Sequence, residues 1–175
     1  ILISYFIIKN FEYNILVNTI LIASALYLFF VTLRDFFIKQ YKNLAQNIAH
    51  FGFSLLILSI LFNNLLSTEI ITNLKVGETY EDSKTKIVFE SIDQKNQENY
   101  KAIIANFSIL NSNGTNNNLL PELRIYNQPK ITTSEADIHT TLMKDKFIVI
   151  NLVQNQDYFN VRYQVKPFMF WIWLS

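Results

Sequence analysis

The stretch Asn47-Ile48-Ala49-His50-Phe51-Gly52-Phe53-Ser54 opens an apolar run that continues to Leu66. From Leu44 to Leu66 the chain has 23 residues without Asp, Glu, Lys or Arg. At ~1.5 Å per residue, a helix of this length crosses a hydrocarbon layer of ~30 Å. The run therefore predicts a transmembrane helix over 44–66, and His50 is its one ionisable side chain.

The polar neighbours of His50 predict how this helix is oriented. Gln46, Asn47 and Ser54 lie three or four positions away from His50, so on a helix they share one stripe with it. A charged group inside a span costs about 2.5 kcal/mol or more, so a histidine there is expected to face protein rather than lipid. We therefore expect the stripe to face other spans.

Three roles for His50 follow from its chemistry. It is a packing histidine that hydrogen-bonds to a neighbouring helix, an axial ligand of haem iron, or a proton relay. The small residues Ala49 and Gly52 would admit either a close helix or a flat macrocycle. A relay is disfavoured because the spans hold no further ionisable residue at depth, and a bis-histidine haem would need a second histidine that neither span supplies.

The residues before this helix predict a further span and a loop. Residues 14–33 include the apolar run Ile15 to Leu33 and are expected to form a transmembrane helix. Residues 1–10 are apolar but too short to span, and we expect the tail of a helix that begins upstream rather than a signal peptide. The loop over 34–43 holds three basic residues against one acidic residue, which predicts a cytoplasmic position. The chain after Leu66 is then on the outer side.

Residues 67–165 change to short apolar runs separated by turn residues, the pattern of a small antiparallel β domain of five to seven strands. Gly114 lies at the centre of an expected hairpin tip over 111–118. A short helix is expected over Glu135 to Met143, with Thr133 or Ser134 as its N-cap. Residues 166–175 return to membrane composition and predict the start of another helix. The expected strands are 86–92, 100–110, 122–126, 147–152 and 158–165.

The fold class that these patterns predict is a membrane protein with α-helical transmembrane spans and a small antiparallel β domain inserted on the outer side.

Composition excludes several functions. The chain has no cysteine, which excludes disulfides and thiolate sites, and its net charge of +1 gives no basic footprint for nucleic acid.

Two polar groups in the β domain are candidate sites. Glu122, Arg124 and Tyr126 alternate along one expected strand and so share a face. They form either an ion pair with a tyrosine beside it or a docking surface for a partner. His139 has no second imidazole or cysteine near it in the sequence and is expected to be a surface residue.

Several motifs, in this order, resemble the C-terminal part of the CcmF-type cytochrome c haem lyases. The resemblance covers the chain from about Arg34 onward. It departs from the family pattern at Ser175, where a glycine is usual, and at Lys146, where an apolar residue is usual. The matching motifs are Ala49-His50-x-Gly52, Asn99-Tyr100, Leu120-Pro121-Glu122-x-Arg124-x-Tyr126, Thr132-Thr133-Ser134-Glu135-Ala136-x-Ile138, Lys144-Asp145-x-Phe147, Lys166-Pro167-Phe168 and Trp171-Ile172-Trp173-Leu174.

The resemblance implies part of an enzyme that attaches haem covalently to apocytochrome c. It implies that His50 is one of two axial ligands of a transmembrane haem b, the other ligand and the substrate-haem site lying upstream. The implied partners are a haem chaperone, apocytochrome c, other membrane proteins of cytochrome c maturation and membrane lipid. The implied location is the bacterial inner membrane with a periplasmic β domain, or the mitochondrial inner membrane. The alternative is a membrane-anchored scaffold of an assembly complex that has no cofactor of its own.

Overall fold

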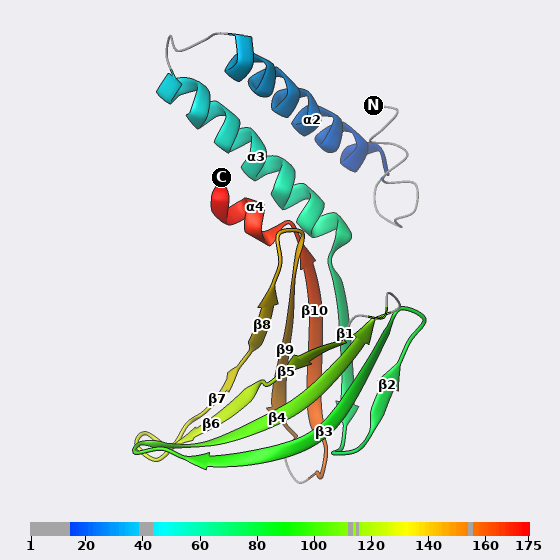
Figure 1. The fold of residues 1–175 in the computed structure, drawn as a ribbon, viewed down its shortest axis with the longest axis vertical. Helices are drawn as coiled ribbons and strands as arrows, with labels where there is room; N and C mark the ends of the chain where they lie inside the picture. Colours follow the sequence, from blue (N-terminus) through cyan, green and yellow to red (C-terminus); the bar gives the residue numbers. More distant parts are fainter. Residues whose placement is uncertain (1–14, 39–43, 112–113, 115, 154–155) are drawn as a thin grey trace. The chain divides into compact units, whose positions relative to one another are not determined.

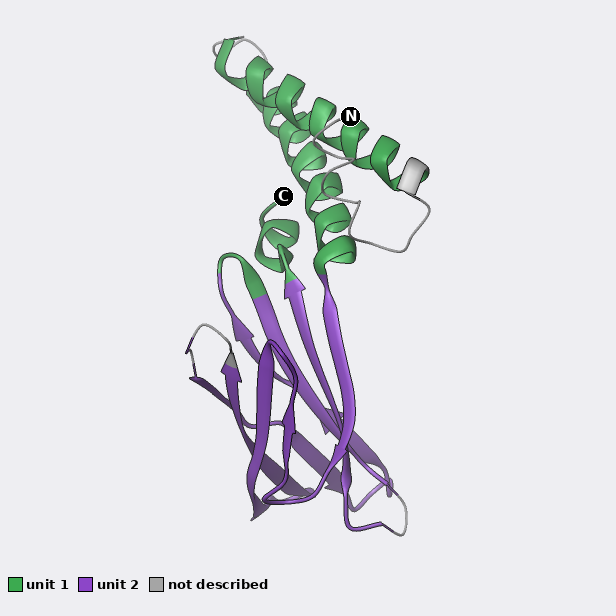
Figure 2. Cartoon of the chain, turned by 90° about the vertical axis from the view of Figure 1, so that its right-hand side faces the viewer, with its two compact units in different colours: residues 1–66, 142–144, 167–175 green, residues 67–141, 145–166 purple. Residues whose placement is uncertain are grey.

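The computed structural model describes residues 15–38, 44–111, 114, 116–153 and 156–175 (Figure 1). The expected helix tail over 1–10 lies outside the described residues. The chain forms two compact units (Figure 2). Unit 1 contains Ile1–Leu66, Leu142–Lys144 and Pro167–Ser175, and unit 2 contains Ser67–Thr141 and Asp145–Lys166.

Unit 1 holds a hairpin of two long helices, α2 (Ile15–Ile38) and α3 (Leu44–Leu66). Both are long and apolar enough to cross a membrane, as judged by length and composition among the described residues. The bounds of α3 are those expected from the sequence. The α2 helix continues through Arg34 and Asp35 to Ile38, so the first half of the expected loop over 34–43 is helical. Its aromatic end contacts α3, since the ring centroids of Phe36 and Phe51 are 6.1 Å apart.

A short helix, α4 (Met169–Leu174), also belongs to unit 1. The chain enters it through Phe168, whose left-handed φ of 61° turns the backbone sharply after β10. The ring of Phe168 lies 5.4 Å from that of Phe62 on α3, centroid to centroid. The side-chain amide of Asn63 donates a hydrogen bond of 2.6 Å to the carbonyl of Pro167. These contacts hold the beginning of α4 against the last turns of α3.

Unit 2 is an antiparallel β-sandwich. Among the described residues, one sheet has the strand order β1-β10-β9-β8 and the other has the order β2-β3-β4-β6-β7, with β5 paired to β4. Their bounds are β1 (Thr68–Leu74), β2 (Thr79–Glu81), β3 (Thr85–Asn96), β4 (Tyr100–Asn111), β5 (Asn116–Leu119), β6 (Glu122–Tyr126), β7 (Thr132–Glu135), β8 (Asp137–Thr140), β9 (Lys144–Leu152) and β10 (Phe159–Pro167).

Alternating apolar side chains of the two sheets meet in one core, as period-two strands require. Phe89 on β3 and Phe107 on β4 are fully buried, and their rings stack with centroids 4.4 Å apart. Ile148 and Ile150 on β9 and Val161 on β10 complete the opposite side of the core. The sequence predicted the antiparallel β domain, but the described part of it has more strands than the five to seven expected.

The expected helix over Glu135 to Met143 is wrong. Glu135 ends β7 and pairs with Glu122, whereas Ile138 lies in β8 and pairs with Phe147. Cross-strand pairing therefore overrides the local capping signal from Thr133 and Ser134, since propensity is a weak determinant beside tertiary contacts.

Lys146 occupies a core position of β9. It is 5% exposed and alternates with the buried Ile148 and Ile150. Its ammonium donates a hydrogen bond of 2.8 Å to the side-chain carbonyl oxygen of Asn117 on β5. The charge of this lysine is thus directed to a polar partner.

Candidate functional site

The α3 helix presents three faces, and the first packs against α2. At 100° per residue, Asn47, Phe51, Ser54 and Leu58 fall on this face. The Ser54 side chain is fully buried, and its hydroxyl lies 2.8 Å from the hydroxyl of Thr32 on α2. The expected polar stripe is therefore divided, because Ser54 serves helix packing as membrane-type helix pairs do.

The second face of α3 packs against α4. A methyl group added at Gly52 would lie 3.6 Å from the backbone carbon of Ser175. Ser59, on the same face, is 2% exposed. The small size of Gly52 thus admits the end of α4. Since Gly52 lies two residues from His50, it points to the opposite side of the helix and does not make room for a macrocycle beside the imidazole.

His50 lies on the third face. Its side chain is exposed, as are Gln46, Phe53 and Ile60 along the same side of α3. Among the described residues no hydrogen bond to His50 is seen, and neither α2 nor α4 covers it. Phe53 is 61% exposed and Ile60 is 48% exposed, so this face is apolar beyond His50, whereas the exposed Gln46 lies one turn before it. Such a face can supply one nitrogen ligand to a group that is held against the helix.

The β6 cluster consists of Glu122, Arg124 and Tyr126 with Tyr100 on β4 and Glu135 on β7. The guanidinium Nε of Arg124 lies 3.1 Å from a carboxylate oxygen of Glu122, and a second guanidinium nitrogen lies 4.0 Å from Glu135. The guanidinium carbon also lies 5.3 Å from the centroid of the Tyr100 ring, a cation–π distance. The three predicted residues therefore share one face, as their alternation requires.

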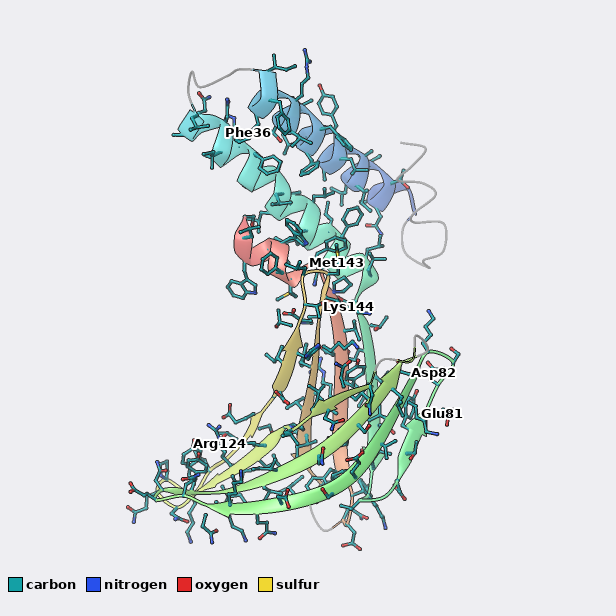
Figure 3. The ribbon with its side chains drawn as sticks, viewed as in Figure 1. Phe36, Glu81, Asp82, Arg124, Met143 and Lys144 are labelled. Carbon is teal, nitrogen blue, oxygen red and sulfur yellow. The ribbon has the colours of Figure 1, made fainter. Side chains whose placement is uncertain are left out.

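The charge of Arg124 is held firmly in this cluster. Its hydrogen bond with Glu122 is the largest effect and raises the pKa of the guanidinium above its usual value, desolvation opposes this rise, and Tyr126 adds a smaller increase. The side chains of Arg124 and Glu122 remain 33% and 29% exposed. Figure 3 shows Arg124 on β6. The ion pair that we considered as the plain interpretation is present, and the part that stays exposed is a surface that a partner can reach.

Sequence reasoning missed two members of this cluster. Tyr100 pairs directly with Tyr126 across β4 and β6, and their ring centroids are 5.2 Å apart. The alternation signal on one strand cannot reveal the register of the next strand, which places Tyr100 beside Arg124. Glu135 was missed because it was assigned to a helix.

Other chemical sites were sought among the described residues. His139 is exposed on β8, and its backbone pairs with that of Lys146. The described part of the chain has no group of three or more His, Asp or Glu residues that could hold a metal ion. His50 on α3 and the β6 cluster are therefore the two candidate sites.

The class that these features define is an antiparallel β-sandwich inserted in the chain between apolar helices. The family model described as the CcmF C-terminal beta-sandwich matches residues 65–167. The chain belongs to this CcmF family, and the resemblance inferred from the sequence is confirmed.

Similar proteins agree with this assignment. The cytochrome c-type biogenesis protein CcmF of Haemophilus influenzae is 26% identical over 128 residues, which are 73% of this chain and 20% of that protein. The cytochrome c-type biogenesis protein ccl1 of Rhodobacter capsulatus is 32% identical over 99 residues, which are 57% of this chain and 15% of that protein. The CcmF protein of Escherichia coli is 24% identical over 125 residues, which are 71% of this chain and 19% of that protein. The chain thus spans about a fifth of the length of these relatives.

A solved structure named Cytochrome c Heme Lyase CcmF has the same fold. Its TM-score is 0.67 at 16% identity, and the match covers 99% of this chain and 30% of that one. The helices and the β-sandwich therefore have counterparts in a known haem lyase structure.

Proposed function

We propose that this chain is the C-terminal part of a cytochrome c haem lyase, which attaches haem covalently to apocytochrome c, and that His50 is one axial ligand of a transmembrane haem b. The observation that carries the proposal is the placement of His50 on the one face of α3 that neither α2 nor α4 covers. The family assignment supplies the chemical context.

The residues around His50 could hold a haem against α3. The imidazole is exposed, and the apolar side chains of Phe53 and Ile60 follow it on the same face, while the polar Gln46 precedes it by one turn. Neutral imidazole is a common axial ligand of haem iron, and apolar surroundings suit the macrocycle. A haem bound there would supply one-electron redox chemistry. The second ligand would come from the rest of the protein, since the described part of this chain has one histidine in its long helices.

The proposed setting is a membrane, with α2 and α3 as spans and the β-sandwich on the outer, periplasmic side. The length and apolar composition of the two helices support it. So does the charge of the last turns of α2 and the residues that follow it, where Arg34, Lys39 and Lys42 outnumber Asp35. In a mitochondrial protein the corresponding location would be the inner membrane.

We further propose that the β6 cluster docks a partner of cytochrome c maturation, either the haem chaperone or the apocytochrome. Arginine and tyrosine dominate the energetics of many protein interfaces. In this cluster, neighbouring residues already fix both side chains, so little conformational entropy would be lost on binding. The partly exposed ion pair of Arg124 and Glu122 is the observation that supports this role.

The experiment that tests the haem proposal uses the full-length parent protein purified in detergent. We expect a b-type signal in its reduced-minus-oxidised absorption spectrum. We expect the His50→Ala variant to lose or shift that signal at equal expression. The matched control is His139→Ala, which removes the other histidine of this chain and should leave the spectrum unchanged. An unaltered spectrum in His50→Ala would contradict the proposal and favour the alternative of a scaffold that has no cofactor of its own.

A further inference from the structure

We propose that the tip of the β8–β9 hairpin, residues Leu142–Lys144, inserts into the interface of the lipid bilayer and anchors the outer domain to the membrane surface. This inference rests on the proposed function in one respect, because it takes α3 to be a membrane span. The occupant of this surface is lipid, at the boundary between headgroups and acyl chains.

Hydrogen bonds fix the tip next to the end of α3. Asn63, in the last turn of α3, donates to the carbonyl of Pro167 at 2.6 Å. The next residue, Phe168, donates its backbone N–H to the carbonyl of Met143 at 2.9 Å. Two hydrogen bonds and one peptide unit therefore join the end of the predicted span to the hairpin tip. All of these residues belong to one compact unit, which Figure 2 shows in a single colour.

The level of this attachment corresponds to the membrane interface. The α3 helix ends at Leu66. Near this end, after a long and mainly apolar stretch, the helix has two consecutive polar residues, Asn63 and Asn64. A polar pair at the end of a span marks the depth at which hydrocarbon gives way to headgroups. The tip is held at that depth, and Figure 3 shows Met143 and Lys144 at the hairpin end beside α4.

The side chains of the tip have the chemistry that this depth requires. Leu142 is 61% exposed and Met143 is 63% exposed. Both side chains are apolar, so exposing them to water is unfavourable. In the same unit, Trp173 is 80% exposed. Tryptophan concentrates at membrane interfaces, where an amphipathic ring suits the headgroup level. Lys144 follows directly and is also exposed, and the apolar stem of a lysine is compatible with the interface.

The test places a nitroxide spin label in the full-length protein, reconstituted in nanodiscs of phosphatidylcholine. This chain has no cysteine, so Leu142→Cys and Met143→Cys each give a single site in this part of the protein once other cysteines are removed. Power saturation then compares access by oxygen, which concentrates in lipid, with access by a nickel chelate, which stays in water. The matched control is Ile131→Cys, an apolar residue that is 49% exposed outside this unit.

We expect the ratio of oxygen to nickel access to be several-fold higher at positions 142 and 143 than at position 131. The inference would be overturned if the nickel chelate reached positions 142 and 143 as readily as position 131. Exclusion of both reagents from both positions would also overturn it, because protein would then cover the tip. A label at Tyr27→Cys on α2 separates the two claims. If nickel reaches that position, the membrane setting of the proposed function is wrong, whereas nickel exclusion there with a water-exposed tip refutes the lipid anchor alone.

Discussion

The hydroxyl of Thr32 on α2 lies 2.8 Å from the hydroxyl of Ser54 on α3, at a point where both side chains are buried. Each hydroxyl also lies within hydrogen-bond distance of a backbone carbonyl of its own helix. One hydroxyl can therefore donate to the other while the other donates to the backbone. This contact fixes the register of the helix pair and so decides which face of α3 remains uncovered.

Removal of this contact should weaken the helix pair. We expect a double-mutant cycle of Thr32→Val and Ser54→Ala to give a coupling energy of about 0.6 to about 1.7 kcal/mol, the range of hydrogen bonds between membrane helices. The measurement is unfolding of the full-length protein in mixed micelles. Ser24→Ala is the control, because Ser24 donates only to the carbonyl of Ile20 in its own helix. Additive effects of the two substitutions would show that the hydroxyls do not interact.

Removal of the Tyr163 hydroxyl should stabilise the β-sandwich. The side chain is 1% exposed, and its hydroxyl has no hydrogen-bond partner among the described residues, while burial raises its pKa to about 12. A buried hydroxyl without a partner costs about 1 to 3 kcal/mol, so Tyr163→Phe should raise the free energy of unfolding. Tyr126→Phe should not do so, because the Tyr126 side chain is partly exposed and does not carry the cost of an isolated buried hydroxyl. Urea unfolding of the sandwich in the full-length protein checks both, and destabilisation by Tyr163→Phe would count against this packing.

Glu69 should make the β1–β10 pair sensitive to acid. Hydrogen bonds from Gln164 and then from Arg162 lower the pKa of the Glu69 carboxyl below its usual range. A depressed pKa in the folded state gives stability that is present above the unfolded pKa of about 4.3 and is lost as the pH falls through the folded value. The melting temperature should therefore fall more steeply below about pH 4 in the parent than in Glu69→Gln. Equal acid profiles for the two proteins would refute this role of Glu69.

Arg124→Lys should weaken the binding of a maturation partner without unfolding the sandwich. Lysine keeps the charge, but it cannot hold Glu122 and stack on Tyr100 with one planar group. We expect a loss of about tenfold or more in affinity for the haem chaperone or the apocytochrome, the effect typical of an interface hot spot. The matched control is Arg162→Lys. Arg162 is exposed and forms an ion pair with Glu69, and both residues lie on the sheet that does not contain β6. Equal affinities of both variants would exclude the β6 cluster as a docking surface.

Parts of this structure followed from the sequence because their signals are local. An uncharged apolar run sets the bounds of α3, and alternation sets the strand over 122–126, which matches β6. The strand β5, Asn-Asn-Asn-Leu, has no such signal and is formed by pairing with β4. The helix expected near Glu135 failed for the same reason, since its residues pair across strands.

The candidate site was predictable only in part. Sequence spacing placed Ser54 and His50 in one stripe, but their separation onto a packed face and an open face depends on where α2 and α4 lie. Likewise, the sequence left open whether Gly52 admits a close helix or a macrocycle, and the position of Ser175 shows that it admits α4. Contacts between elements decide such questions, and the chain sequence does not encode them in any short pattern.

The central claim is that the imidazole of His50 coordinates haem iron, and imidazole rescue tests it most directly. His50→Gly in the full-length protein leaves space where the side chain was, and added imidazole can then occupy the vacant axial position. We predict that the b-type band is lost or shifted in His50→Gly and returns with imidazole, while the His139→Gly protein keeps its band throughout. A band that is unchanged in His50→Gly, or a lost band that imidazole does not restore although the protein remains folded, would contradict the claim.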